Sequence, residues 1–169
     1  MAETGILTPE ARVELVDGEM IDMVPISSVH AACVDRFVHF FSGRLGKAAI
    51  LRVQNPLRLN EFTELQPDLA LLKPRDDFYA GRHPGPGDVL LVVEVAASSL
   101  SYDRGVKLPL YAAAGIPELW LVDLDGRRLS VHREPAGKGY AQVEIPAPGQ
   151  PIHPALLPDL ALFPDELLR

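Results

Sequence analysis

The chain has 169 residues, 47% of them hydrophobic and 23% charged, with a formal net charge of −7 at pH 7. This length suits one domain over residues 1–169, and the apolar fraction excludes general disorder. A single cysteine, Cys33, excludes an intramolecular disulfide and a cysteine-rich metal site. Because the net charge is negative, a polyanionic partner would have to bind at a local basic patch or at a bound metal.

The sequence shows no sign of a targeting or membrane segment. Its first residues lack the basic and apolar regions of a signal peptide. The densest apolar run, 89–97, is interrupted by Glu94 and is far shorter than the roughly 20 residues that a membrane-spanning helix needs. We therefore expect a soluble, cytoplasmic protein with no membrane partner.

The N-terminal segments predict a hairpin followed by a helix. Asp17-Gly18 lies between two short strand-like runs, 13–16 and 20–23, which is typical of a tight turn. Ser27-Ser28 can cap a helix, and apolar residues continue at helical spacing from there to about residue 45.

The middle of the chain predicts strands and a second helix. Ser101 or Asp103 can cap that helix, which Gly115-Ile116-Pro117 closes. The run before it, 89–95, is β-branched and apolar on both alternating faces, which indicates a central buried strand. Earlier in this region we expect strands at 49–53, 57–59 and 69–72 and a turn-rich loop at 73–88.

The C-terminal part predicts a further strand, a hairpin and a tail. The run 119–122 leads through Asp125-Gly126 into strands at 129–132 and 140–145, and six prolines between residues 146 and 164 indicate a tail that wraps the domain and ends in a short helix. The whole pattern predicts one α/β domain with a mixed central sheet. Its parts are an N-terminal hairpin (1–27), a core (about 28–124) with the order helix, three strands, helix, strand, and a hairpin extension with a proline-rich tail (125–169).

One carboxylate stands out because it lies inside the most apolar strand of the chain. Glu94 shares a strand face with Leu90 and Val92 and is near the end of the strand, where α/β sheets place their ligands. An ionised carboxylate buried there without a partner would cost several kcal/mol. Asp68 opens a second apolar strand directly after Pro67. Taken singly, Glu94 could be a carboxylate exposed at a strand end, and Pro67-Asp68 could be an ordinary turn.

The helix that follows Glu94 carries polar residues on one stripe. Asp103, Lys107 and Tyr111 are spaced at i, i+4 and i+8, and Lys107 is about one turn inside the helix, so that its ammonium can reach back over the end of the Glu94 strand. Taken singly, Asp103 and Lys107 could be a solvated helix pair. Two carboxylates on neighbouring strands with a lysine nearby form an oxygen-rich site that suits Mg²⁺ or Mn²⁺ and metal-assisted phosphodiester hydrolysis.

The order of these residues resembles the PD-(D/E)xK phosphodiesterase superfamily, and specifically its branch of bacterial restriction-endonuclease-like proteins. The matching residues are Pro67-Asp68, Glu94-Val95, Asp103-Arg104, Lys107, Tyr111-Ala112 and Gly115-Ile116-Pro117-Glu118-Leu119-Trp120-Leu121-Val122-Asp123. The resemblance covers nearly the whole chain, from 13–19 through the hairpin after Trp120. It implies a restriction-endonuclease-like αβββαβ core, which is the order of elements expected above.

The resemblance also implies a site. Asp68 and Glu94 would be metal ligands, helped by the backbone carbonyl of Val95, and the cofactor would be Mg²⁺, with Mn²⁺ as a substitute. The superfamily lysine would stand two positions after Glu94, where this chain has Ala96. In this branch the following helix supplies it, and Lys107 is the matching residue, so that Asp68, Glu94 and Lys107 form the expected catalytic set.

Four further residues are expected to support this set. Glu14 and Gln54 match recurrent positions of the branch, either as further ligands or as partners of the ligands, and Asp103 and Tyr111 lie on the stripe of Lys107. His30, at the start of the first helix, is interpreted as a polar neighbour of the helix cap and is left out of the site.

The resulting hypothesis is a Mg²⁺-dependent endonuclease that hydrolyses DNA by attack of a metal-activated water and forms a homodimer. One alternative is a catalytically silent nuclease-like module for binding or assembly. Another is that Lys107 and Glu94 form a purely structural ion pair. The candidates for phosphate contacts are Arg36, Arg44, Lys47, Arg52 and Arg58, with Arg75, Arg82 and His83 in the long loop. The apolar residues that could form an interface or cover the core are Leu156, Leu157, Leu160, Leu162 and Phe163.

Overall fold

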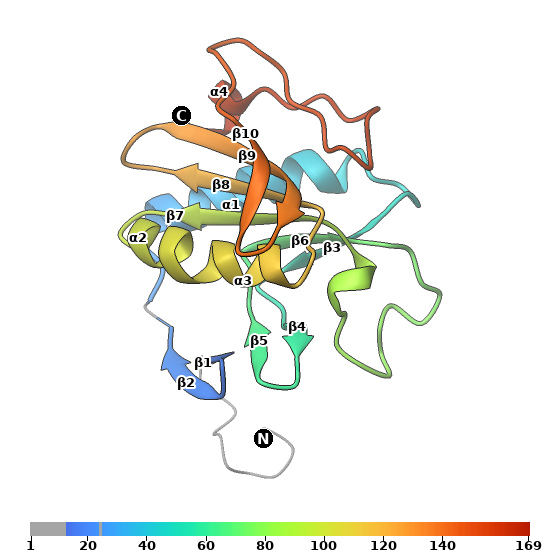
Figure 1. Ribbon diagram of the computed structural model, residues 1–169. Coiled ribbons are helices and arrows are strands. Elements are labelled where there is room, and N and C mark those ends of the chain that lie inside the picture. Colours follow the sequence, from blue (N-terminus) through green and yellow to red (C-terminus); the bar gives the residue numbers. More distant parts are fainter. Residues whose placement is uncertain (1–12, 24) are drawn as a thin grey trace.

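A computed structural model describes residues 13–23 and 25–169, and its strands form two sheets (Figure 1). The larger sheet has six strands in the order β10-β9-β8-β7-β6-β3. Its strands are β3 (Ile50–Val53), β6 (Leu69–Leu72), β7 (Val89–Ala96), β8 (Glu118–Asp123), β9 (Arg128–Ala136) and β10 (Gly139–Glu144). The smaller sheet, in the order β2-β1-β5-β4, consists of β1 (Val13–Val16), β2 (Glu19–Asp22), β5 (Thr63–Leu65) and β4 (Leu57–Asn60).

The centre of the larger sheet is β7, whose eight residues are all buried. It pairs in antiparallel orientation with β6 and in parallel orientation with β8, so the mixed sheet predicted from the sequence is confirmed. A strand covered on both faces requires apolar side chains on both, which explains the unbroken run before Glu94.

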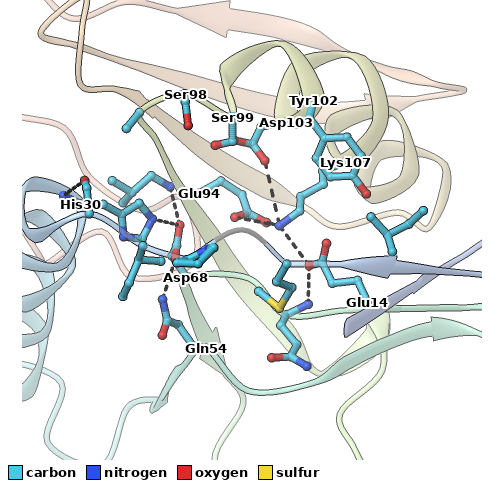
Figure 2. Close-up of a pocket in the computed structure, with 18 of the residues that line it drawn as sticks. Glu14, His30, Gln54, Asp68, Glu94, Ser98, Ser99, Tyr102, Asp103 and Lys107 are labelled. Carbon is cyan, nitrogen blue, oxygen red and sulfur yellow. Dashed lines mark hydrogen bonds and ion pairs between the residues drawn. The ribbon is translucent and has the colours of Figure 1, made fainter. Parts of the chain in front are cut away.

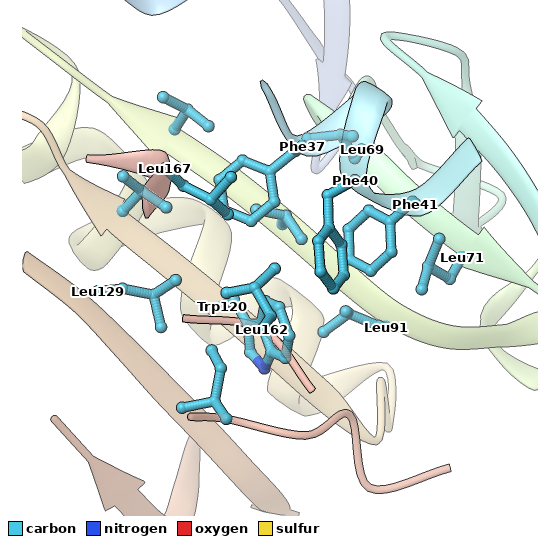
Figure 3. Close-up of a cluster of buried hydrophobic side chains, with 14 of the residues drawn as sticks. Phe37, Phe40, Phe41, Leu69, Leu71, Leu91, Trp120, Leu129, Leu162 and Leu167 are labelled. Carbon is cyan, nitrogen blue, oxygen red and sulfur yellow. The ribbon is translucent and has the colours of Figure 1, made fainter. Parts of the chain in front are cut away.

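Helices cover both faces of this sheet. On one face, α1 (Ser28–Ser42) packs three phenylalanines against the sheet, where Phe41 meets Trp120 with ring centroids 6.3 Å apart (Figure 3). Ser27 caps this helix by accepting a hydrogen bond from the His30 amide at 3.2 Å. On the other face, Tyr111 and Ile116 pack against alternate residues of β6 and β7. The two cores hold the ends of β6 and β7 in place.

The helix on the second face contains a widened turn. It runs without interruption through α2 (Leu100–Tyr102), the π-helical turn η2 (Asp103–Lys107) and α3 (Leu108–Ala113). A proline inside a regular helix clashes with the carbonyl four residues earlier, which here is that of Gly105 before Pro109. The π turn lies directly before Pro109, and in it the Leu108 amide bonds the Asp103 carbonyl five residues back. The predicted helix is therefore present, and its proline is accommodated by widening.

The smaller sheet corrects the expected use of the hairpin and of the strand at 57–59. The Asp17-Gly18 hairpin is present, with Asp17 at φ 48° and Gly18 at φ 88°, but β1 also pairs with β5. The strand expected at 57–59 is β4 and belongs to this sheet, so the three strands between the two helices of the core are β3, β6 and β7. No expectation covered β5, because Thr63–Leu65 is short and has a charged centre.

The C-terminal tail crosses the α1 face of the larger sheet. Ile152 and Leu162 form an isolated antiparallel bridge, and the short helix α4 (Pro164–Leu167) packs next to α1. The buried carboxylate of Glu118 fixes the tail by accepting a hydrogen bond from the Ala155 amide at 2.6 Å. The same carboxylate accepts the indole N–H of Trp120, on its own strand, at 2.7 Å. Of the five apolar residues named above, Leu162 is core, Leu157 and Leu160 pack against it, and Leu156 and Phe163 are exposed. Within the described residues, no helix has the length and apolar character needed to cross a membrane.

Candidate active site

A pocket of about 430 Å³ lies at the end of β7, between the larger sheet, η2 and the segment that follows β2 (Figure 2). Three independent parts of the fold supply its polar floor: β1, the ends of β6 and β7, and the helix after β7. All of the expected site residues except Tyr111 line it, and Tyr111 lies directly behind Glu94. The lining members of that set are Glu14, Gln54, Asp68, Glu94, Val95, Asp103 and Lys107.

Asp68 is held by three donors. The amide of Val95 donates to Oδ2 at 2.9 Å, the side-chain amide of Gln54 donates to Oδ1 at 3.1 Å, and His30 Nε2 lies 3.1 Å from Oδ2. Gln54 follows β3 with φ 50°, a left-handed conformation that is costly for a residue with a side chain. Its backbone N–H also donates a hydrogen bond to the backbone carbonyl of Asp68 at 3.0 Å. These contacts fix the carboxylate at the start of β6.

Glu94 lies beside Asp68 on the neighbouring strand. The antiparallel register pairs Leu69 with Val93, so the next pair along the two strands is Asp68 and Glu94. Glu94 is 3% exposed, and Tyr111 Oη donates to its Oε1 at 2.6 Å. Because alternate residues of β7 face opposite sides, Glu94 points to the side covered by α3, where Tyr111 lies.

Lys107 places its ammonium among three carboxylates (Figure 2). Its Nζ lies 3.0 Å from Glu14 Oε1, 3.3 Å from Glu94 Oε1 and 4.0 Å from Asp103 Oδ1. Glu14 Oε1 also accepts the Gln66 amide at 2.8 Å, which links β1 to the strand of Asp68. The lysine therefore ties together β1, β7 and the π turn.

The charges of the floor are unbalanced, with four carboxylates around one lysine and one histidine. Burial raises the pKa of Glu94 above its ordinary range, while Lys107 works in the opposite direction. Burial alone would lower the pKa of Lys107, but Glu94, Glu14 and Asp103 together raise it well above its ordinary range, so we take the lysine to be charged. Burial also raises the pKa of Asp103, whose Oδ2 accepts a hydrogen bond from Ser99 at 2.7 Å. A second cation would be attracted to this floor.

His30 lines the pocket, although the sequence interpretation left it out of the site. It is 8% exposed, and its hydrogen bond with Asp68 raises the pKa of the imidazole. Its other ring nitrogen, Nδ1, is buried without a partner among the described residues. The signal available in the sequence was its position in the first turn of α1, since that end of the helix packs over the end of β7.

The basic residues expected to contact phosphate lie outside this pocket. Arg75 pairs with Asp77 and Arg82 with Asp88, each at 2.8 Å, in a loop that joins the ends of β6 and β7 opposite Asp68 and Glu94. Three others donate to backbone carbonyls of their own surroundings: Arg36 to Leu167, Arg44 to Phe40 and Arg52 to Phe78. Of the described residues that line the pocket, Lys107 is the only lysine or arginine.

The oxygen donors of the floor fit a hard divalent cation. Among the described residues, no group of three or more His, Cys, Asp or Glu side chains is arranged so that it could hold a metal ion by itself. Mg²⁺ does not need such a cage, because it is commonly held by one or two carboxylates together with water and substrate oxygens. Asp68 and Glu94, on adjacent strands and facing one cavity, match that requirement.

Comparisons with known proteins agree with this architecture. The model of the Uma2 family, described as "Putative restriction endonuclease", matches residues 3–164. The crystal structure of a putative nuclease belonging to DUF820 from Anabaena variabilis ATCC 29413 is similar with a TM-score of 0.75 and 17% sequence identity, over 98% of this chain and 94% of that one. At this identity the likeness shows the fold, and the predicted mixed α/β architecture is confirmed. No curated protein matches the chain.

Proposed function

The chain belongs to the Uma2 family, and from this premise we propose that it is a Mg²⁺-dependent nuclease that hydrolyses phosphodiester bonds in DNA. The family membership predicted from the sequence is confirmed. The observation that carries the proposal is the placement of Asp68, Glu94 and the buried ammonium of Lys107 on the floor of one pocket.

In this proposal Asp68 and Glu94 hold the metal, and the carbonyl of Val95 is a third ligand. The N–H and C=O of one strand residue point to the same edge, and the Val95 N–H bonds Asp68, so its carbonyl is directed to the same side. When bound, Mg²⁺ supplies Lewis-acid polarisation of a phosphoryl oxygen and lowers the pKa of a water.

The other side chains position these groups. His30 and Gln54 orient the Asp68 carboxylate, and Tyr111 orients that of Glu94. The Lys107 ammonium is the only lysine or arginine charge among the described lining residues, so it is placed to stabilise the negative charge that develops on the phosphoryl group. Glu14 and Asp103 also lie around the Lys107 ammonium, which keeps it at the floor of the pocket.

The test is nicking of supercoiled plasmid by the purified protein with Mg²⁺, Mn²⁺ or EDTA. We expect metal-dependent nicking by the wild type and its loss in Asp68→Ala, Glu94→Gln and Lys107→Ala. Asp88→Ala is the matched control, because this carboxylate pairs with Arg82 in the loop at the opposite end of the strands. Equal activity in all variants would indicate a contaminating nuclease, and no cleavage of any tested nucleic acid by the wild type would favour a binding or assembly module without catalysis.

A purely structural ion pair between Lys107 and Glu94 would have the same geometry as a catalytic one. The stability of the Glu94→Gln variant distinguishes these two hypotheses. If the pair served only the fold, Glu94→Gln would destabilise it severely, because it would remove one charged partner of a buried ion pair. If the pair serves catalysis, Glu94→Gln loses activity with its melting temperature near that of the wild type, since it relieves repulsion among crowded carboxylates.

The expected homodimer is a separate proposal. Dimers with two-fold symmetry are by far the commonest soluble homo-oligomers. The mass of the protein in solution, measured by light scattering during size-exclusion chromatography, tests it independently of activity.

A further inference from the structure

The pocket has two chemically different sides. Its floor carries the carboxylates and Lys107, whereas one wall, formed by β2 and the described residues that follow it, is mainly apolar, with Asp22 as its charged member. Ile21, Met23, Pro25 and Ile26 line that wall, and Ile26 remains 42% exposed although it borders the cavity. An exposed apolar side chain at the edge of an acidic site indicates a ligand with an uncharged surface as well as a charged group.

The side chains of the floor are almost fully buried. Glu14 and Glu94 are each 3% exposed, Lys107 7% and Asp68 8%. The cavity of about 430 Å³ is near the lower end of the roughly 300–1,000 Å³ of small-molecule pockets. A B-form duplex is stiff, and its major groove alone is about 12 Å wide, so a cavity of this size fits a single nucleotide better than a paired duplex.

The charges around the pocket also disfavour a long polyanion. Binding to duplex DNA depends on lysines and arginines that neutralise several phosphates. Here the described lining residues include five acids and one lysine, and the arginines of the long loop are paired with Asp77 and Asp88 at the far ends of β6 and β7. Among the described lining residues, Lys107 and a bound metal are the only fixed cations that a phosphate could meet.

We propose that the pocket takes a single nucleotide unit of an unpaired strand, with its phosphate at the floor and its sugar and base against the wall of Ile21, Met23, Pro25 and Ile26. This inference rests on the proposed function and names its substrate class: single-stranded DNA, or an unpaired segment within a duplex. The apolar wall then contributes affinity that the acidic surroundings cannot supply.

Cleavage of three substrates of one sequence tests the proposal. They are an end-labelled single-stranded oligonucleotide, its full duplex, and a duplex with a central unpaired bubble, each incubated with the full chain and Mg²⁺. Since freeing a nucleotide from a duplex costs a few kcal/mol, we expect the single strand and the bubble to be cut at least about tenfold faster than the duplex. For the same reason, supercoiled plasmid should be nicked faster than relaxed plasmid.

The outcomes separate this inference from the proposed function. Equal rates on duplex and single strand would overturn the inference and leave the nuclease proposal standing. Cleavage of none of the substrates, while Mg²⁺ is present, would count against the nuclease proposal itself and with it the inference. Faster cutting of the duplex would also overturn the inference and would favour a site that opens around paired DNA.

A pair of variants tests the apolar wall. Ile26→Ser changes a lining residue, and Val29→Ser is its control, because Val29 is 63% exposed three positions away and does not line the pocket. We expect Ile26→Ser to raise the KM for the single strand about tenfold, the equivalent of about 1.4 kcal/mol of lost apolar contact, with kcat little changed. Val29→Ser should behave as the wild type. The same KM for both variants would overturn the assignment of the wall.

Discussion

Lys107 Nζ lies closer to Glu14 Oε1, at 3.0 Å, than to Glu94 Oε1, at 3.3 Å. The lysine is thus shared between the smaller sheet, through β1, and the strand that carries the proposed metal ligand. Glu14 also accepts the Gln66 amide, close to the start of β6, so that one carboxylate connects the two sheets and the lysine. The smaller sheet is therefore part of the site and more than an appendage to it.

The first prediction separates the charge of Glu14 from its hydrogen bond. Glu14→Gln keeps an oxygen for the Gln66 amide, whereas Glu14→Ala leaves that buried donor without an acceptor. We expect Glu14→Ala to lower the free energy of unfolding by about 1–3 kcal/mol and Glu14→Gln to cost clearly less. Urea unfolding followed by circular dichroism measures both, and equal losses would contradict this division of roles.

The second prediction concerns competition between Lys107 and a metal. Lys107→Met keeps the apolar stem but removes the only cation shared by Glu14, Glu94 and Asp103 among the described residues. In EDTA we expect it to cost about 3–5 kcal/mol of stability, because a buried ion pair is broken on one side. Added Mg²⁺ should then raise the melting temperature of Lys107→Met more than that of the wild type, since no ammonium occupies the carboxylates. An equal rise in both proteins would show that the lysine does not compete.

The third prediction uses two tyrosines that each donate one hydrogen bond. Tyr111 Oη donates to Glu94 at 2.6 Å and Tyr140 Oη donates to the Ile116 carbonyl at 3.1 Å. Each Tyr→Phe substitution should lower the free energy of unfolding by at most about 3 kcal/mol. Nicking activity should fall in Tyr111→Phe alone, because only that hydroxyl orients a proposed metal ligand. Loss of activity in Tyr140→Phe to the same extent would indicate a general effect of destabilisation.

The fourth prediction is a pH dependence of stability that originates away from the pocket. Burial lowers the pKa of His132 below its ordinary value of 6.5, and the positive charge of Arg104 adds to the effect, while Ser130 and the ring of Tyr140 are its uncharged neighbours. The unfolded chain therefore binds a proton at His132 more readily than the folded one, and this contribution to stability is complete above pH 6.5 and is lost as the pH falls toward the folded pKa. The pKa of His30 is raised, so its contribution to stability changes with pH in the opposite direction. That contribution is present in the wild type and in a His132 variant alike.

His132→Gln removes the first effect. We expect the wild type to lose more stability than this variant between pH 7.5 and pH 5.5, as measured by urea unfolding at the two pH values. A parallel loss in the two proteins would assign the pH dependence to other groups.

Local patterns were sufficient to predict most of the fold. The apolar run before Glu94 predicts a central strand because burial on both faces demands it, and Asp17-Gly18 predicts a hairpin because both residues adopt positive φ. The catalytic set could be proposed because Asp68 and Glu94 are polar interruptions of apolar strands. In the structure Asp68 and Glu94 line the same pocket, which agrees with that proposal. Their catalytic roles remain predictions.

The remaining features depend on contacts between segments that are distant in sequence. The strand at Thr63–Leu65 is short and has a charged centre, and besides its neighbour β4 it pairs with β1 of the N-terminal hairpin, which is distant in sequence. His30 resembles a cap neighbour until α1 is packed over the end of β7, where Asp68 lies. The π turn at Asp103–Lys107 follows from Pro109, but a proline in a helical pattern predicts a break as readily as a widened turn.

The C-terminal tail also determines when the protein can finish folding. Leu167 is 5% exposed in the core on the α1 side, and its carbonyl accepts a hydrogen bond from Arg36 of α1 at 3.2 Å. During synthesis α1 appears early, yet one of the side chains that covers it is made more than a hundred residues later. Until then part of its apolar face has no cover, so an incomplete chain presents a surface on which chaperones, proteases and other nascent chains can act. Contacts of such long separation in sequence also slow folding, because the intervening chain must be ordered before they form.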